Sequence, residues 1–240
     1  MKRDESKAPR VNSFLIHEDS ARIVVATGFQ TKSSNAKTGA MVQIWILNRH
    51  ENPVAAVKSG ADRVICGDCP LRRDPQTGKR GCYVRVEQAP LAIWKAYNAG
   101  KYSRLVDLSL FKGRFVRFGA YGEPIHIPFA LVRAIVATVG AGNFTGYTHQ
   151  WRNDLYRNYQ QFFMASVGAN DYLAAEQMGW RTFVVSARAI EKHVLCPASK
   201  EAGHRVNCVD CRLCSGASKQ ARSIWIPPHG AGKKAASMAA

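Results

Sequence analysis

The sequence predicts an α/β fold, either a partial or a complete β/α barrel, with a small C-terminal cysteine-rich metal lobe. Three observations carry this prediction. Apolar segments rich in Val and Ile alternate with helical patterns along most of the chain, and the connections between them are short. The predicted strands are continuous apolar runs, as in a parallel sheet covered on both faces. An open doubly wound sheet is the alternative architecture.

In the first half, the sequence predicts strands over residues 21–29 and 41–48, and helices over 53–60 and 88–102. Branched and aromatic side chains favour the strands. Pro53 and Gly60 bound the first helix, with proline at the start and glycine at the end. Pro90 and Gly100 bound the second helix in the same way.

The second half continues the alternation. The predicted strands cover residues 114–119, 144–150, 162–167 and 181–186, and the predicted helices cover 128–140, 153–161, 170–179 and 187–195. Asn153 or Asp154 would cap one helix, and Gly179 would end another. A last strand is expected within residues 222–230, ending at His229.

The predicted organisation has a flexible N-terminus (1–13), a β/α core (14–190), a four-cysteine metal-binding lobe (191–230) and a disordered tail (231–240). The N-terminal residues are charged and lack the apolar stretch of a secretory signal. The apolar runs are too short to cross a bilayer, so no membrane contact is expected. A cytoplasmic location is therefore predicted, where cysteines stay reduced.

The chain is strongly basic, with 34 Lys and Arg against 17 Asp and Glu and a formal net charge of +17. Such a balance makes a polyanion a plausible partner, either nucleic acid or a phosphate-bearing small molecule. The alternative is that the charge serves only solubility.

The first cysteine group comprises Cys66, Cys69 and Cys82, separated by two and by twelve residues. Pro75 and Gly78 would let the longer loop bend back. Three thiolates suit two kinds of centre. One is a zinc site that takes a fourth ligand from elsewhere, such as His50 or Asp68, and the other is a [4Fe–4S] cluster with one iron left open.

The second group contains four cysteines, Cys196, Cys208, Cys211 and Cys214. Two intervals of two residues resemble those of ferredoxin clusters, whereas zinc ribbons have two separated pairs. Three alternatives remain open for this group: an iron–sulfur cluster, a zinc site, in which His204 could replace one cysteine, and buried thiols without metal. A loaded site would either transfer electrons or only stabilise the lobe.

Polar residues follow several predicted strands, where parallel β/α folds place their chemistry. We take His149, Gln150, Glu123 and Arg117 as candidate catalytic residues. Each also has a structural interpretation. Glu123 lies in a Gly- and Pro-rich turn before a helix, and His149 fits a core histidine. A buried Arg117 must be paired, with Glu123 or with a bound anion.

The cysteine trio followed by "RFVRFG" and "AYGEP" resembles radical S-adenosylmethionine enzymes. Their three-cysteine [4Fe–4S] cluster lies near the end of the first barrel strand, and a Gly-Gly-Glu-Pro motif after the second contacts the cofactor's amine. Gly122, Glu123 and Pro124 match that motif, and Tyr83 supplies an aromatic beside the last cysteine. The family spaces its cysteines by three and two residues and has glycine where this chain has Tyr121.

This resemblance implies S-adenosylmethionine as cofactor, an external electron donor and an auxiliary four-cysteine cluster. The residues that it implies at the cofactor are Gly119, Tyr121, Gly122, Glu123, Pro124 and Ser166, and those that it implies along the substrate cavity are His149, Gln150, Trp151 and Ser166.

The whole chain is also similar to phage- and plasmid-encoded cysteine-rich proteins of unknown function. The shared features are "KTG", "CGDC", "CY", a "G-x-YG-[DE]-P" turn, "GYTHQW" and the C-terminal cysteines. The expected function is thus an iron–sulfur enzyme of a mobile element. The alternative is a zinc-stabilised, basic nucleic-acid-binding protein without catalysis.

Overall fold

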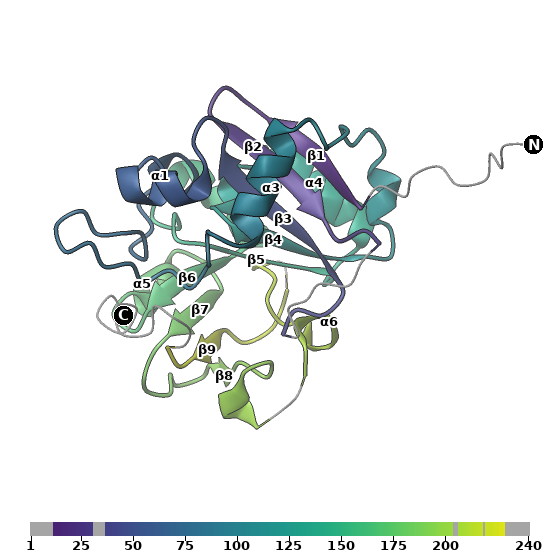
Figure 1. Cartoon of the computed structure of the whole chain (residues 1–240). Coiled ribbons are helices and arrows are strands. Elements are labelled where there is room, and N and C mark those ends of the chain that lie inside the picture. The colour runs from purple at the N-terminus through teal and green to yellow at the C-terminus, as the bar shows by residue number, and fades with distance from the viewer. Residues whose placement is uncertain (1–11, 31–36, 204–205, 218, 229–240) are drawn as a thin grey trace, which may run out of the picture.

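The computed structural model describes residues 12–30, 37–203, 206–217 and 219–228. They form an α/β fold around one nine-stranded sheet in the order β1-β2-β3-β4-β5-β6-β7-β9-β8 (Figure 1). The strands are β1 (Ser13–Glu18), β2 (Arg22–Thr27), β3 (Met41–Asn48), β4 (Phe115–Tyr121), β5 (Phe144–Thr148), β6 (Met164–Gly168), β7 (Thr182–Val185), β8 (Val194–Leu195) and β9 (Ile224–Ile226).

The first three strands are antiparallel, and every later pairing is parallel. The sheet is not closed, since β1 and β8 stand at its two ends. The predicted α/β class is therefore confirmed, whereas a barrel and a separate metal lobe stay predictions. Both β8 and β9 come from the segment assigned to that lobe, and they extend the same sheet.

The connections carry the helices α1 (Pro53–Ser59), α2 (Arg63–Cys66), α3 (Ala89–Asn98), α4 (Phe129–Val139), α5 (Tyr172–Gln177) and α6 (Cys208–Cys211), and the 3-10 helices η1 (Leu108–Phe111), η2 (Pro124–His126), η3 (Asp154–Gln161) and η4 (Lys200–Ala202). Asn52 caps α1 by accepting from the backbone N–H groups of Val54 and Ala55, and Gly60 ends it in the left-handed conformation.

The two faces of the sheet differ in chemistry. Along β4, Val116 and Phe118 are buried in the hydrophobic core, whereas Arg117 between them points to the opposite face. Ring contacts join Phe118 to Phe144 and Phe163. Polar and aromatic side chains on the Arg117 face border a cavity.

Two predictions about elements are wrong. Residues 187–195 are not helical, because Lys192 has a positive φ of 62° and the backbone N–H of Val194 donates to Ser223 as β8 pairs with β9. Ser13, assigned to the flexible N-terminus, begins β1, which the sequence analysis did not identify. The last strand ends at Ile226. Residues 1–11, His229 and the predicted tail lie outside the described residues.

No helix in the described ranges is both long and apolar enough to cross a membrane.

Candidate metal centres and the cavity beside them

The first cysteine group is brought together by a short helix and a folded loop. Cys66 is the last residue of α2, and the N–H of Cys69 donates to its carbonyl oxygen at 3.1 Å. The N–H of Cys82 donates to Leu71 at 2.8 Å, which returns the loop to the first two cysteines. Gly78 turns with φ of 68°, so this loop bends back as predicted.

A buried ion pair anchors this loop. Asp62, only 2% exposed, accepts from the guanidinium of Arg72 at 2.6 Å. The same guanidinium donates to the carbonyl oxygens of Gly60 and Gly67 on either side of α2. Burying a charge is tolerated when such partners surround it, so the pair fixes the loop relative to the sheet.

All three cysteines line one cavity of about 230 Å³. Part of the remaining wall comes from the ends of parallel strands, where function gathers in β/α folds. The lining includes Gly119, Tyr121, Gly122 and Glu123 at the end of β4, His149 after β5, Ser166 in β6, and Cys208 of the second group.

The turn after β4 depends on glycine for close packing. Gly122 has φ of 79°, and a Cβ there would lie 2.7 Å from the carbonyl oxygen of Ile46. The next residue, Glu123, donates its backbone N–H to Ile65 of α2 at 2.7 Å. The turn therefore packs directly against the helix that carries Cys66.

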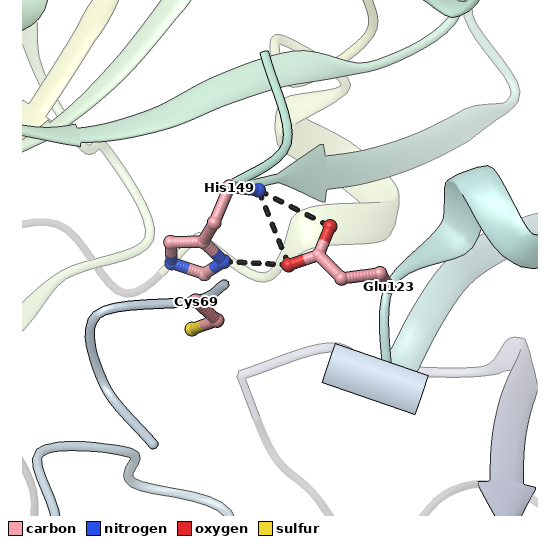
Figure 2. A group of neighbouring side chains, drawn as sticks. All are labelled: Cys69, Glu123 and His149. Carbon is pink, nitrogen blue, oxygen red and sulfur yellow. Dashed lines mark hydrogen bonds and ion pairs between the residues drawn. The ribbon is translucent and has the colours of Figure 1, made fainter. Parts of the chain in front are cut away.

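Glu123 is 4% exposed, and its carboxylate accepts four hydrogen bonds. The Thr148 hydroxyl donates at 2.6 Å. The His149 backbone N–H reaches both oxygens at 3.1 Å, and His149 Nδ1 lies 2.8 Å from Oε1 (Figure 2). A carboxylate has about four acceptor positions. A ligand amine would thus have to replace one of these donors to reach Glu123.

Cys69, Glu123 and His149 have ligand atoms within 4.8 Å of one another, the only such group of three metal-ligating residues in the described part of the chain (Figure 2). Burial opposes the charge on His149, but the interactions with Cys69 and with the Glu123 carboxylate outweigh it and raise the His149 pKa well above its ordinary value. The arrangement links a thiol, an imidazole and a carboxylate at the cavity wall.

Burial raises the pKa of Cys66 well above its ordinary value, and it also raises the pKa of Cys82. Both thiols therefore hold their protons more firmly than an exposed cysteine does. A metal must displace those protons, so metal uptake strengthens as the pH rises.

Two buried donors near this group lack a partner among the described residues. They are the hydroxyl of Tyr121 and Nε of Arg80. Tyr121 is coupled electrostatically to Cys66 and Cys82, and Arg80 is coupled to Cys82. Unsatisfied buried donors are costly, and sulfur atoms of a bound centre are acceptors that would satisfy them. The surroundings of the trio thus fit a sulfur-rich group.

The second cysteine group borders a smaller, adjacent cavity of about 40 Å³ lined by Cys196, Cys208, Cys211 and Cys214. Cys196 follows β8, and its N–H donates to Trp225 of β9 at 2.9 Å. Burial raises the pKa of Cys214 to about 12 and also raises those of Cys208 and Cys211. Cys208 borders both cavities, so the two groups share a wall.

Arg181 holds the loop around Cys214. It is 8% exposed, and its guanidinium donates to the carbonyl oxygens of Leu213, Ser215, Ala221 and Arg222. This one side chain fixes the segment between α6 and β9, which positions the cysteines without any regular element there.

Several predicted partners differ in the structure. The first group does not recruit His50 or Asp68, because His50 bonds to the carbonyl oxygen of Ser20 and Asp68 pairs with Arg63. Arg117 does not pair with Glu123; it donates to the Tyr83 hydroxyl at 2.9 Å. His204 lies outside the described residues.

His149 and Ser166 border the cavity as expected. Gln150 instead lies against Gly67, whose added Cβ would be 2.7 Å from its amide carbon. Trp151 is 3% exposed and packs in the core. Pro124 is buried in η2, directly after the cavity-lining Glu123.

The sequence analysis missed Thr148 and Tyr147. Thr148 donates to Glu123, and Tyr147 borders both cavities with its ring tilted against that of Phe183, the ring centroids 4.7 Å apart. Both lie in "GYTHQW", and their alternation along a strand could have placed Tyr147 on the same face as Arg117.

Comparison of the chain with protein-family models, with curated proteins and with solved structures found no match.

Proposed function

We propose that this chain is an iron–sulfur enzyme of a phage or other mobile element, similar to radical S-adenosylmethionine enzymes. A [4Fe–4S] cluster on Cys66, Cys69 and Cys82 would keep one iron open, and Cys196, Cys208, Cys211 and Cys214 would hold an auxiliary centre. The observation that carries the proposal is the cavity, which all three cysteines border together with the turn Gly119–Glu123.

The spacing of the sulfur atoms favours a cluster over a single zinc ion. Four ligands at about 2.3 Å around one ion bring sulfurs to roughly 3.8 Å from one another. Neither cysteine group forms a set of three within 4.8 Å in the described residues. A cluster binds each cysteine through a different iron, which suits wider separations.

The chain's own residues have distinct roles in this proposal. The Tyr121 hydroxyl and Arg80 Nε would donate to the cluster's sulfur atoms. Glu123 orients His149 at the cavity wall through two contacts. A cluster held by Cys66, Cys69 and Cys82 would supply one-electron reductive cleavage of S-adenosylmethionine, with the electron coming from an external donor.

The proposal is tested by anaerobic reconstitution with iron and sulfide, followed by iron analysis and an assay for cleavage of S-adenosylmethionine. A brown protein that cleaves the cofactor is expected. Cys66→Ser should lose both the first cluster and cleavage, whereas Cys211→Ser should lower only the auxiliary iron. Full iron loading without cofactor binding would reject the radical reaction and leave the cluster.

The net charge of +17 favours a second candidate, a zinc-stabilised protein that binds nucleic acid. Such binding should weaken steeply with salt, because each phosphate contact releases counterions. Colourless protein containing zinc, with salt-dependent affinity for DNA or RNA, would support this candidate. Affinity that is absent or independent of salt would reject it.

A further inference from the structure

Arg117 is the main charged group on the sheet face beside the cavity. It lies in β4, near the middle of the sheet, paired with Gln43 of β3 and Thr145 of β5. Its side chain borders the large cavity with Thr145, Tyr147 and Ser166, all from neighbouring strands. The strand order therefore delivers one guanidinium and several hydroxyl groups to a single wall.

No carboxylate in the described part of the chain forms an ion pair with Arg117. Its guanidinium instead donates a hydrogen bond from Nη2 to the hydroxyl of Tyr83 at 2.9 Å. The other two titratable groups that act on it are Tyr147 and Cys208. Neither of these two groups is a carboxylate.

The rest of the cavity does not supply the missing charge. Glu123 is its one carboxylate among the described residues, and His149 already pairs with it. Lys37 adds a second cation to the lining. Enclosed charges are stable when paired, and a guanidinium binds a carboxylate or a phosphate through two parallel hydrogen bonds. Arg117 is thus a guanidinium at the cavity wall that no carboxylate among the described residues pairs with.

We propose that Arg117 binds an oxyanion of the substrate, a carboxylate or a phosphate, in the cavity beside the three-cysteine centre. Thr145 and Ser166 would add hydroxyl donors, and Tyr83 orients the guanidinium. This inference rests on the proposed function, since it names the substrate class for the same cavity. One rival counter-ion exists, the Cys208 thiolate once the second cysteine group has bound metal.

The test measures binding of inorganic phosphate, and separately of acetate, to the full metal-loaded chain by anaerobic titration calorimetry at constant ionic strength. We expect saturable binding at one site. The anion that binds more tightly indicates whether the substrate's oxyanion is a phosphate or a carboxylate. Arg117→Met should weaken it roughly tenfold or more, because hydrogen bonds to charged groups contribute strongly. The anion affinity of Arg117→Lys should lie between those of the wild type and Arg117→Met, since lysine keeps the charge without the two-donor geometry.

Arg114→Met is the matched control, because this exposed arginine stands three residues earlier on the same segment and should leave binding unchanged. Equal metal content and circular dichroism establish that each variant is folded. If the metal-free chain binds the anion and metal loading abolishes this binding, the Cys208 thiolate is the counter-ion of Arg117 and the proposal is overturned. Absent binding, or binding that survives Arg117→Met, would also overturn it.

Metal content is measured on the same samples, which separates the two proposals. A chain that contains zinc and still binds phosphate through Arg117 would reject the iron–sulfur function and keep the oxyanion site. A chain with both clusters and no anion binding would reject the oxyanion site and keep the iron–sulfur function.

Discussion

At the scale of single residues, the pairing of Glu123 with His149 is the main determinant of charge at the first centre. The carboxylate faces the backbone and ring of the histidine at once, while Thr148 fills another acceptor position. A histidine held in this way keeps one ring orientation. With Nδ1 bound to Glu123, the Nε2 atom of His149 is the ring nitrogen left to interact with the Cys69 side chain.

The change Glu123→Gln should lower the pKa of His149, because a neutral amide no longer favours the imidazolium that the carboxylate stabilises. In the wild-type metal-free chain, His149 should stay protonated above its ordinary range. Histidine NMR titration measures both values. Glu87→Gln, at an exposed glutamate, is the control, and an unchanged His149 titration in Glu123→Gln would contradict the assignment.

Residue chemistry was the part of the site most accessible from sequence. Both cysteine groups, Glu123 and His149 were identifiable by type and spacing alone. The partner of Arg117 was not, because Tyr83 is 34 residues away along the chain. His50 and Asp68 are closer to the cysteines along the chain. His50 nevertheless bonds to the carbonyl oxygen of Ser20, and Asp68 pairs with Arg63. Distance along the chain is a poor guide to a fourth ligand.

At the scale of elements, the loop between Cys69 and Cys82 depends on Asp62. The change Asp62→Ala leaves the Arg72 guanidinium partly buried without its carboxylate. We expect a loss of about 3 kcal/mol in the free energy of unfolding and reduced iron at the first centre. Urea denaturation of the metal-free chain and iron analysis check this.

Asp68→Ala is the matched control for that prediction. The ion pair of Asp68 with Arg63 is exposed, with side-chain exposures of 75% and 69%. Its removal should cost less than about 1 kcal/mol and leave the metal content unchanged. Equal effects of the two changes would show that the buried pair does not anchor the loop.

The turn after β4 gives a second prediction for an element. Gly122→Ala forces a Cβ to within 2.7 Å of a carbonyl oxygen, at a φ that L-residues disfavour. Gly113→Ala has a similar φ of 70°, but nothing lies within 4 Å of the added Cβ. Thermal unfolding should therefore show a larger loss for Gly122→Ala by about 1 kcal/mol or more. Similar losses would mean that φ alone matters.

Most elements could be predicted because their signals are local. The strand over 41–48 and the helix over 53–60 contain their own apolar pattern or end residues, and both were confirmed. The error at 187–195 has a non-local cause, since β8 exists through pairing with β9, about thirty residues later. The missed β1 likewise depends on pairing with β2.

At the scale of the whole molecule, the buried thiols connect stability to pH. Unfolded cysteines titrate near 8.5 on average, whereas folded Cys214 titrates at about 12. The folded metal-free chain therefore binds more protons between these values. Its stability is complete below about pH 8.5 and falls as the pH rises toward 12, by about 2 kcal/mol at pH 10 from this thiol alone.

Urea denaturation of the metal-free chain at pH 7.5 and pH 9.5 measures that fall. The metal-loaded chain should not show it, since its thiols are already deprotonated. Cys214→Ala is the control, and it should reduce the fall in the free energy of unfolding of the metal-free chain between the two pH values. A metal-free chain whose stability is the same at both pH values would contradict the burial of these thiols.

The position of β9 has a consequence for synthesis. This strand lies between β7 and β8, although it is the last of the nine along the chain. During translation, Val194 and Leu195 leave the ribosome with no neighbour to pair with until Ile224–Ile226 follow. The cysteines held beside them are thus assembled only after Ile224–Ile226 have been synthesised, and a chain stopped before Ile224 would expose the bare edge of β7 to other nascent proteins.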